Sequence, residues 1–62
     1  MKAHELTLPG ISFKRFCMKN GKVLWSHAHM HGDRKRVCFS RKSKGKLLKM
    51  YVNPHTEVEI VS

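Results

Sequence analysis

Acidic residues are scarce in this 62-residue chain, which has 4 Asp and Glu against 13 Lys and Arg and a formal net charge of +9. The acids are Glu5, Asp33, Glu57 and Glu59, so the eight basic residues within 34–49 lie in a stretch with no acid. An excess of this size favours a polyanionic partner over a merely solvated surface.

Cysteine and long apolar runs are also scarce. Two cysteines, Cys17 and Cys38, are too few for a disulfide framework, and we expect both to be thiols. No apolar run approaches the roughly 20 residues of a membrane-spanning helix. Residues 1–9 include Glu5 and lack the apolar centre of a signal peptide. The sequence therefore predicts a cytoplasmic protein.

The chain is short, and we expect residues 1–62 to form a single small basic domain. A domain of this size buries only about 60% of its unfolded surface, which argues against a deep substrate cavity. It has no GxGxxG sequence, no Walker-type loop and no CxxC pair. We therefore expect no cofactor, no dedicated metal site and no enzymatic activity.

Four turn signals divide segments that are rich in Val, Phe, Trp, Tyr, Leu and Met. They are Asn20-Gly21, Gly32-Asp33, residues 43–46 and residues 53–55. Asn-Gly is a strong hairpin signal because both residues tolerate positive φ. The pattern predicts an all-β fold, a five-stranded antiparallel meander or small barrel.

Pairing the strands through these turns sets a testable register. The expected pairs are Phe16 with Trp25, Phe13 with Ala28, Ala28 with Val37, His27 with Cys38, Phe39 with Met50, Met50 with Val58 and Lys49 with Glu59. Because side chains alternate along a strand, this register gathers most apolar residues on one face. The expected core face comprises Ile11, Phe13, Cys17, Leu24, Ala28, Met30, Val37, Phe39, Leu48, Met50, Val52, Val58 and Ile60.

A helix over residues 12–20 is the main alternative. Ser12 can cap such a helix, and Phe13, Phe16 and Cys17 share one helical stripe. The fold would then be α+β, with this helix packed on a three- or four-stranded sheet.

The second face of the predicted sheet interleaves aromatic rings with basic side chains. Bases of single-stranded nucleic acid stack on such rings while Lys and Arg neutralise phosphates. We therefore expect a non-enzymatic protein that binds RNA or DNA. The expected phosphate contacts are Arg34, Lys35, Arg36, Arg41, Lys42, Lys44, Lys46 and Lys49, and the expected base contacts are Phe16, Trp25, His27, His29 and Tyr51.

Three other interpretations use the same residues. The basic surface also suits an acidic host protein, as in a small phage or plasmid factor. His27 and His29 suit a metal-independent ribonuclease, with Arg36 or Lys14 as the cation. With Cys38 opposite, the same histidines offer three ligands to Zn²⁺, but a second closely spaced ligand pair is lacking. The large apolar face also fits a homodimer.

Overall fold

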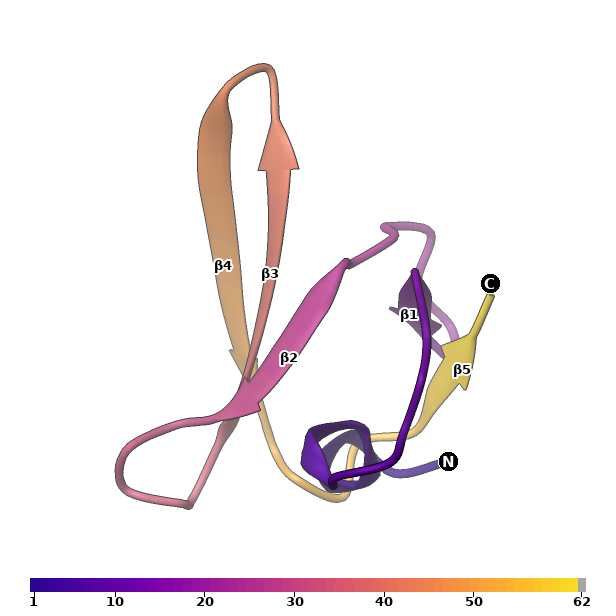
Figure 1. The fold of residues 1–62 in the computed structure, drawn as a ribbon, viewed down its shortest axis with the longest axis vertical. Helices are drawn as coiled ribbons and strands as arrows, with labels where there is room; N and C mark the ends of the chain where they lie inside the picture. The colour runs from indigo at the N-terminus through magenta and orange to yellow at the C-terminus, as the bar shows by residue number, and fades with distance from the viewer. Residues whose placement is uncertain (62) are drawn as a thin grey trace.

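The computed structural model describes residues 1–61, which form five strands and one short 3-10 helix (Figure 1). The elements are η1 (Ala3–Thr7), β1 (Phe16–Met18), β2 (His27–Met30), β3 (Val37–Ser43), β4 (Lys46–Val52) and β5 (Val58–Ile60). One antiparallel sheet has the order β2-β3-β4, and β1 pairs with β5 in a second. The predicted all-β class with five antiparallel strands is confirmed. The alternative helix over 12–20 is wrong, because this segment contains β1.

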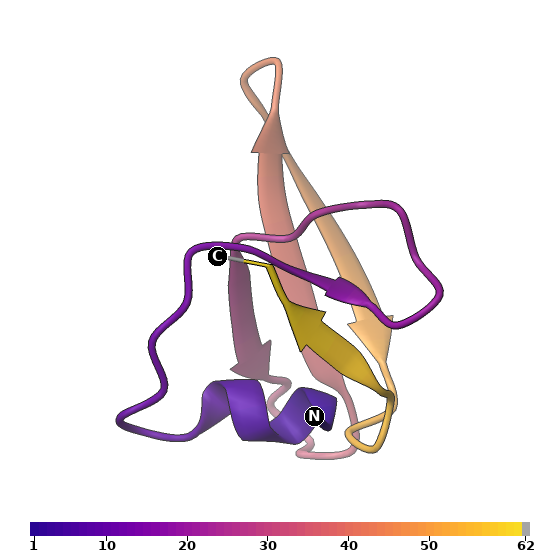
Figure 2. The ribbon, with the colours of Figure 1, turned by 90° about the vertical axis from the view of Figure 1, so that its right-hand side faces the viewer.

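Backbone hydrogen bonds join the two sheets. The N–H groups of Phe16 and Trp25 each donate to the other residue's carbonyl oxygen, at 3.0 and 2.8 Å. Trp25 leads directly into β2, so the chain curls from one sheet to the other around a shared core (Figure 2). On the far side of β5, the Val58 N–H donates to the Met1 carbonyl at 2.8 Å, and η1 covers the end of the core.

Two of the predicted registers are confirmed. Phe39 pairs with Met50 in the β3–β4 hairpin, and Phe16 forms an isolated bridge with Trp25. The second pairing is the one expected from a two-residue turn at Asn20-Gly21. Only the β3–β4 pair is joined by a tight turn of the expected kind. Neither Asn20 nor Gly21 has a positive φ, and the Gly21 N–H donates to the Met18 carbonyl, so the predicted Asn20-Gly21 turn is wrong although the register of the bridge is right.

The predicted pairing of β2 with β3 is wrong by two residues. Ala28 lies opposite Phe39 instead of Val37, because the connection is a six-residue loop over 31–36. Asp33 organises this loop by accepting a hydrogen bond from the Lys35 N–H at 2.9 Å. A slip of two residues keeps every side chain on its predicted face.

The predicted pairing of the last two strands is also wrong. β5 pairs with β1, so Met18 faces Val58, and Lys49 does not face Glu59. A turn after β4 redirects the chain: the Asn53 side chain accepts from the His55 N–H at 2.8 Å. The next residues then pair with the N-terminal segment instead of returning along β4.

The core consists of Ala3, Leu6, Phe16, Trp25, Val37, Phe39 and Val58. Phe13, Met18, Ala28, Met30, Met50 and Val52 pack against it while remaining half-buried. Most of the predicted core face is therefore confirmed. Four members are instead exposed, namely Ile11, Leu24, Leu48 and Ile60, and Cys17 is only half-buried.

A bulge at Ser26 explains why the predicted faces are reversed before β2. The Ser26 N–H donates to the Ser40 carbonyl at 3.1 Å, although the register partner of Ser40 is His27. Ser26 and His27 therefore both lie opposite Ser40, and the extra residue shifts the alternation of side chains between the two faces of the strand. As a result Trp25 and Ala28 both face the core, although three positions separate them.

Candidate nucleic-acid interface

The outer side of the β2-β3-β4 sheet carries a row of exposed polar side chains. We call this surface the basic face, comprising His27, His29, Arg36, Lys42, Lys49 and Tyr51. The cross-strand rows are His29–Cys38–Tyr51 and His27–Ser40–Lys49. The middle residue of each row is buried on the central strand. The outer members therefore flank a shallow floor of small side chains.

Tyr51 offers an aromatic ring on this face, because the residue remains 47% exposed. The Arg36 guanidinium carbon lies 5.5 Å from the ring centroid, a cation–π contact. The His31 ring meets it edge-on, with 5.1 Å between centroids. These neighbours hold the ring in place while leaving much of it accessible. His31 was absent from the predicted site, although its place beside Gly32-Asp33 marked it as a loop residue.

The single carboxylate near the basic face is neutralised within its own loop. The N–H of Lys35 donates to Asp33 and lowers the pKa of that carboxyl, with a further contribution from the hydrogen bond with His31. Arg36 lies 3.7 Å from the second oxygen of Asp33. Asp33 therefore shapes the loop, and Arg36 offsets part of its negative charge.

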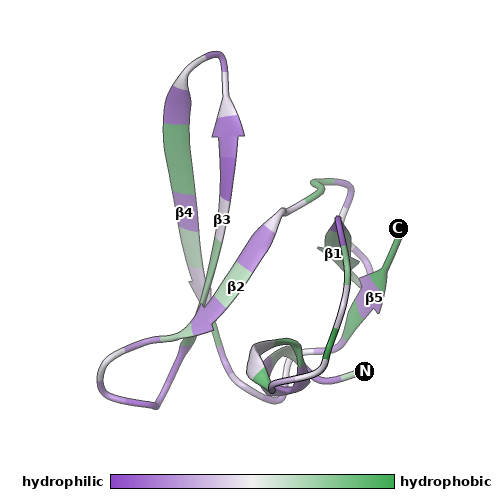
Figure 3. Ribbon diagram, viewed as in Figure 1, coloured by the Kyte–Doolittle hydropathy of each residue, from purple (hydrophilic) through white to green (hydrophobic). Residues whose placement is uncertain are grey.

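The β3–β4 hairpin ends in a second basic loop. Lys44 and Gly45 occupy its two turn positions with φ of 51° and 79°, as a two-residue turn of type I′ requires. The exposed side chains of Lys42 and Lys46 flank this turn. The hairpin projects beyond the rest of the fold, at the opposite end of the sheet from the 31–36 loop (Figure 1). Figure 3 shows hydrophilic residues along the β3 arm of this hairpin and in the 31–36 loop, and a hydrophobic stretch on the β4 arm.

Three predicted contact residues lie on the wrong side. Phe16 is fully buried and Trp25 is 7% exposed, so neither ring is available for stacking. Each packs against the ring of Phe39, with 4.7 and 6.2 Å between centroids. Arg41 faces inward, where its guanidinium carbon lies 5.7 Å from the Trp25 ring. The bulge at Ser26 turned these rings inward, and the sequence carries no separate signal for it.

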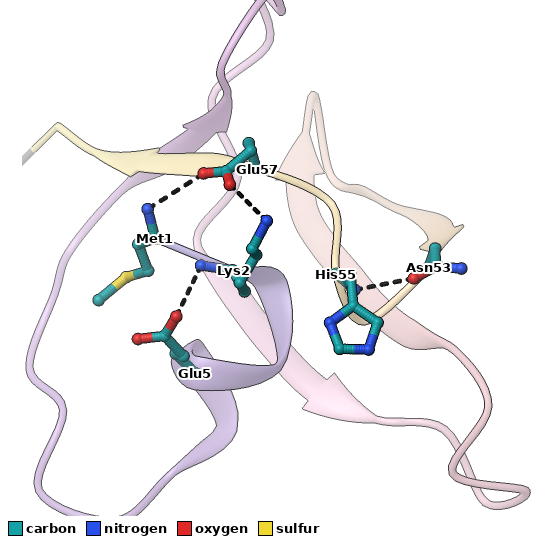
Figure 4. Close-up of polar contacts among 6 residues, drawn as sticks. All are labelled: Met1, Lys2, Glu5, Asn53, His55 and Glu57. Atoms are coloured by element: carbon teal, nitrogen blue, oxygen red, sulfur yellow. Dashed lines mark hydrogen bonds and ion pairs between the residues drawn. The ribbon is translucent and has the colours of Figure 1, made fainter.

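The remaining acids lie elsewhere: Glu5 on η1, Glu57 directly before β5 and Glu59 on β5. Glu57 accepts from the Lys2 ammonium at 2.6 Å and from the Met1 amino group at 3.3 Å (Figure 4). These contacts, the Lys2 hydrogen bond first, lower the pKa of the Glu57 carboxyl. Glu5 accepts from the Lys2 backbone N–H at 2.9 Å. The sheet that bears the basic face thus keeps only Asp33, while eight of the thirteen Lys and Arg lie within 34–49.

The histidines are arranged differently from the alternative in which His27, His29 and Cys38 would bind Zn²⁺. His29 lies opposite Cys38, in place of the predicted His27, and His31 contacts Asp33 at 3.1 Å. Over residues 1–61 the structure shows no group of three His, Cys, Asp or Glu arranged to hold a metal ion. His27 and His29 project from the same face, as the alternation predicted, and so belong to the basic face.

Comparisons with protein-family models, curated proteins and solved structures found no match to this chain. Within residues 1–61, no helix is long and apolar enough to cross a membrane.

Proposed function

We propose that this chain is a non-enzymatic nucleic-acid-binding protein of the cytoplasm, and that the basic face is its contact surface. The observation that carries this proposal is the segregation of charge. Eight basic residues lie on one sheet and its two loops, and the only acid there is engaged by His31 and Arg36. A field of one sign attracts a polyanion and raises its association rate.

The geometry of the basic face suits a backbone that runs along the sheet. Arg34, Lys35 and Arg36 lie at one end, and Lys44 and Lys46 lie at the other. Lys49 lies between these two ends, on β4. Phosphates at both ends and the middle would then be neutralised by exposed, flexible side chains.

Tyr51 and the histidines add contacts to bases. A tyrosine ring stacks on any base, and each such contact contributes about 1–3 kcal/mol in single-strand binding. Tyr51 lies in the row that contains His29, and His27 lies in the row that contains Lys49. Rings and charges therefore alternate across the same surface.

Fluorescence anisotropy with labelled single-stranded RNA, single-stranded DNA and duplex DNA at two salt concentrations tests the proposal. We expect binding that weakens steeply with salt, because bound lysines release counterions from the phosphates. The emission of Trp25 should change little, since this residue is buried. Absence of binding to all three probes at low salt would refute the proposal and favour an acidic protein partner. Loss of RNA integrity, abolished by His27→Ala, would instead support a ribonuclease.

A further inference from the structure

An open groove of about 560 Å³ lies beside the basic face. One wall is the extended segment 11–14, and the other is the start of β2 at residues 26–28. Leu6 of η1 lines the end of the groove. In Figure 1 the chain that leaves η1 rises along the side of β2 that faces away from β3.

The groove lies between two segments that were predicted to pair with each other. In the structure these segments diverge. Phe13 was expected opposite Ala28, but the ladder between them stops at the Phe16–Trp25 bridge. The bulge at Ser26 bends the chain at this point. Beyond it, β2 follows β3, and no strand within residues 1–61 pairs with its other edge.

The free edge of β2 supplies hydrogen-bonding groups inside the groove. The His31 N–H donates to the Arg36 carbonyl at 2.9 Å, so the backbone groups of His31 point toward β3. Because this direction alternates along an antiparallel strand, His29 and His27 also point toward β3. The N–H and C=O of Ala28 consequently point into the groove, next to the side chains of Ser12 and Ser26.

The walls combine apolar side chains with Lys14 and His27. Phe13 and Ala28 are half-buried and pack against the core, so they form a firm apolar lining. Lys14 on one wall and His27 on the other are both exposed. No Asp or Glu lines the groove over residues 1–61. His27 also belongs to the row that contains Lys49, so the groove opens directly onto the basic face.

We propose that this groove binds one unpaired nucleobase of a strand whose phosphates lie on the basic face. This inference rests on the proposed function and narrows its ligand to single-stranded nucleic acid. Apolar side chains beside a peptide donor and acceptor match a planar base that carries edge donors and acceptors. The Lys14 ammonium on one wall matches the phosphates next to that base. A base within a duplex is stacked and paired, and its extrusion costs a few kcal/mol, so duplexes gain little from the groove.

Filling the groove tests the inference. Ser12→Trp places a bulky side chain at an exposed lining position and leaves the core intact. Single-strand affinity should fall about tenfold or more, the range expected for losing one stacked base. Duplex affinity should stay unchanged. Asn20→Trp is the matched control, because Asn20 is exposed in a loop that does not line this groove. Equal thermal midpoints of the two variants would show that both fold.

A nuclear magnetic resonance titration with adenosine 5′-monophosphate, and separately with inorganic phosphate, gives a second readout. The nucleotide should shift the amide signals of Ser12, Ser26 and Ala28, and phosphate should not. Equal shifts with both probes, or nucleotide shifts confined to Lys42 and Lys49, would overturn the groove inference. If the wild type binds oligonucleotides and Ser12→Trp binds them equally well, only the groove inference fails. If the wild type binds none, the proposed function itself fails.

Discussion

Removal of two lysines from the basic face should weaken binding by an amount that can be calculated. Lys42 and Lys49 are both exposed, and over residues 1–61 the structure shows no ion pair for either one. Lys42→Gln with Lys49→Gln should therefore leave the free energy of unfolding nearly unchanged. Their expected contribution is to phosphate contact alone.

The magnitude follows from counterion release. Each phosphate contact on a single strand contributes about 0.7 to the slope of log affinity against log salt. Loss of two contacts lowers the slope by about 1.4, which corresponds to roughly 25-fold weaker binding at about 0.1 M salt. The ratio of wild-type to variant affinity should shrink about sevenfold between about 50 and 200 mM salt.

Lys19→Gln with Lys22→Gln is the matched control. It removes the same charge from exposed positions in the loop that follows β1, outside the basic face. Anisotropy titrations over a salt series should show an affinity within about twofold of wild type, because salt screens exposed charges that do not contact a phosphate directly. Equal weakening by both double variants would refute the reasoning, since net charge alone would then account for binding.

Three further predictions concern the core, the aromatic contact and the acid that precedes β5. Trp25→Ala should cost about 3–5 kcal/mol, comparable with the about 3–9 kcal/mol expected for a whole domain of 62 residues. Urea unfolding should then show that the Trp25→Ala variant is largely unfolded already without urea. A folded variant that binds more weakly would contradict the buried position of Trp25. Tyr51→Ala should weaken single-strand binding by about 1–3 kcal/mol while Tyr51→Phe retains most of it, and equal losses in anisotropy titrations would exclude stacking. Because the pKa of Glu57 is lowered on folding, its stabilisation is present above the ordinary carboxyl pKa of about 4.3 and is lost as pH falls through the folded pKa. Glu57→Gln should therefore show a shallower loss of stability between neutral and acidic pH in urea midpoints, and an unchanged profile would count against the Lys2 contact.

Short-range signals predicted the local parts of the fold. Gly45 marked the turn that pairs Phe39 with Met50, and this feature depends only on neighbouring residues. The bridge of Phe16 with Trp25 has the predicted register, although neither Asn20 nor Gly21 adopts the positive φ of the predicted turn.

The non-local parts were not predictable in the same way. The partner of β5 depends on how η1 and residues 53–56 pack at the end of the core, and no pair of neighbouring residues encodes this. The Ser26 bulge likewise has no signature of its own, yet it moved Trp25 into the core. For the site, the sequence predicted the positions of the two basic loops and the outward position of Tyr51, because turns and strand alternation are local features. The groove beside β2 was missed because it results from strands that fail to pair.

The pairing of β1 with β5 has a consequence for the order of folding. The β3–β4 hairpin joins neighbouring segments, whereas β1 must wait for a strand near the other end of the chain. Contacts between distant segments close more slowly than local ones. We therefore expect the hairpin to form first, with Leu47 and Leu48 exposed and the outer edge of β4 unpaired. Lysines on an open strand edge discourage pairing with other chains, so Lys46 and Lys49 would protect the newly formed hairpin before the core has closed.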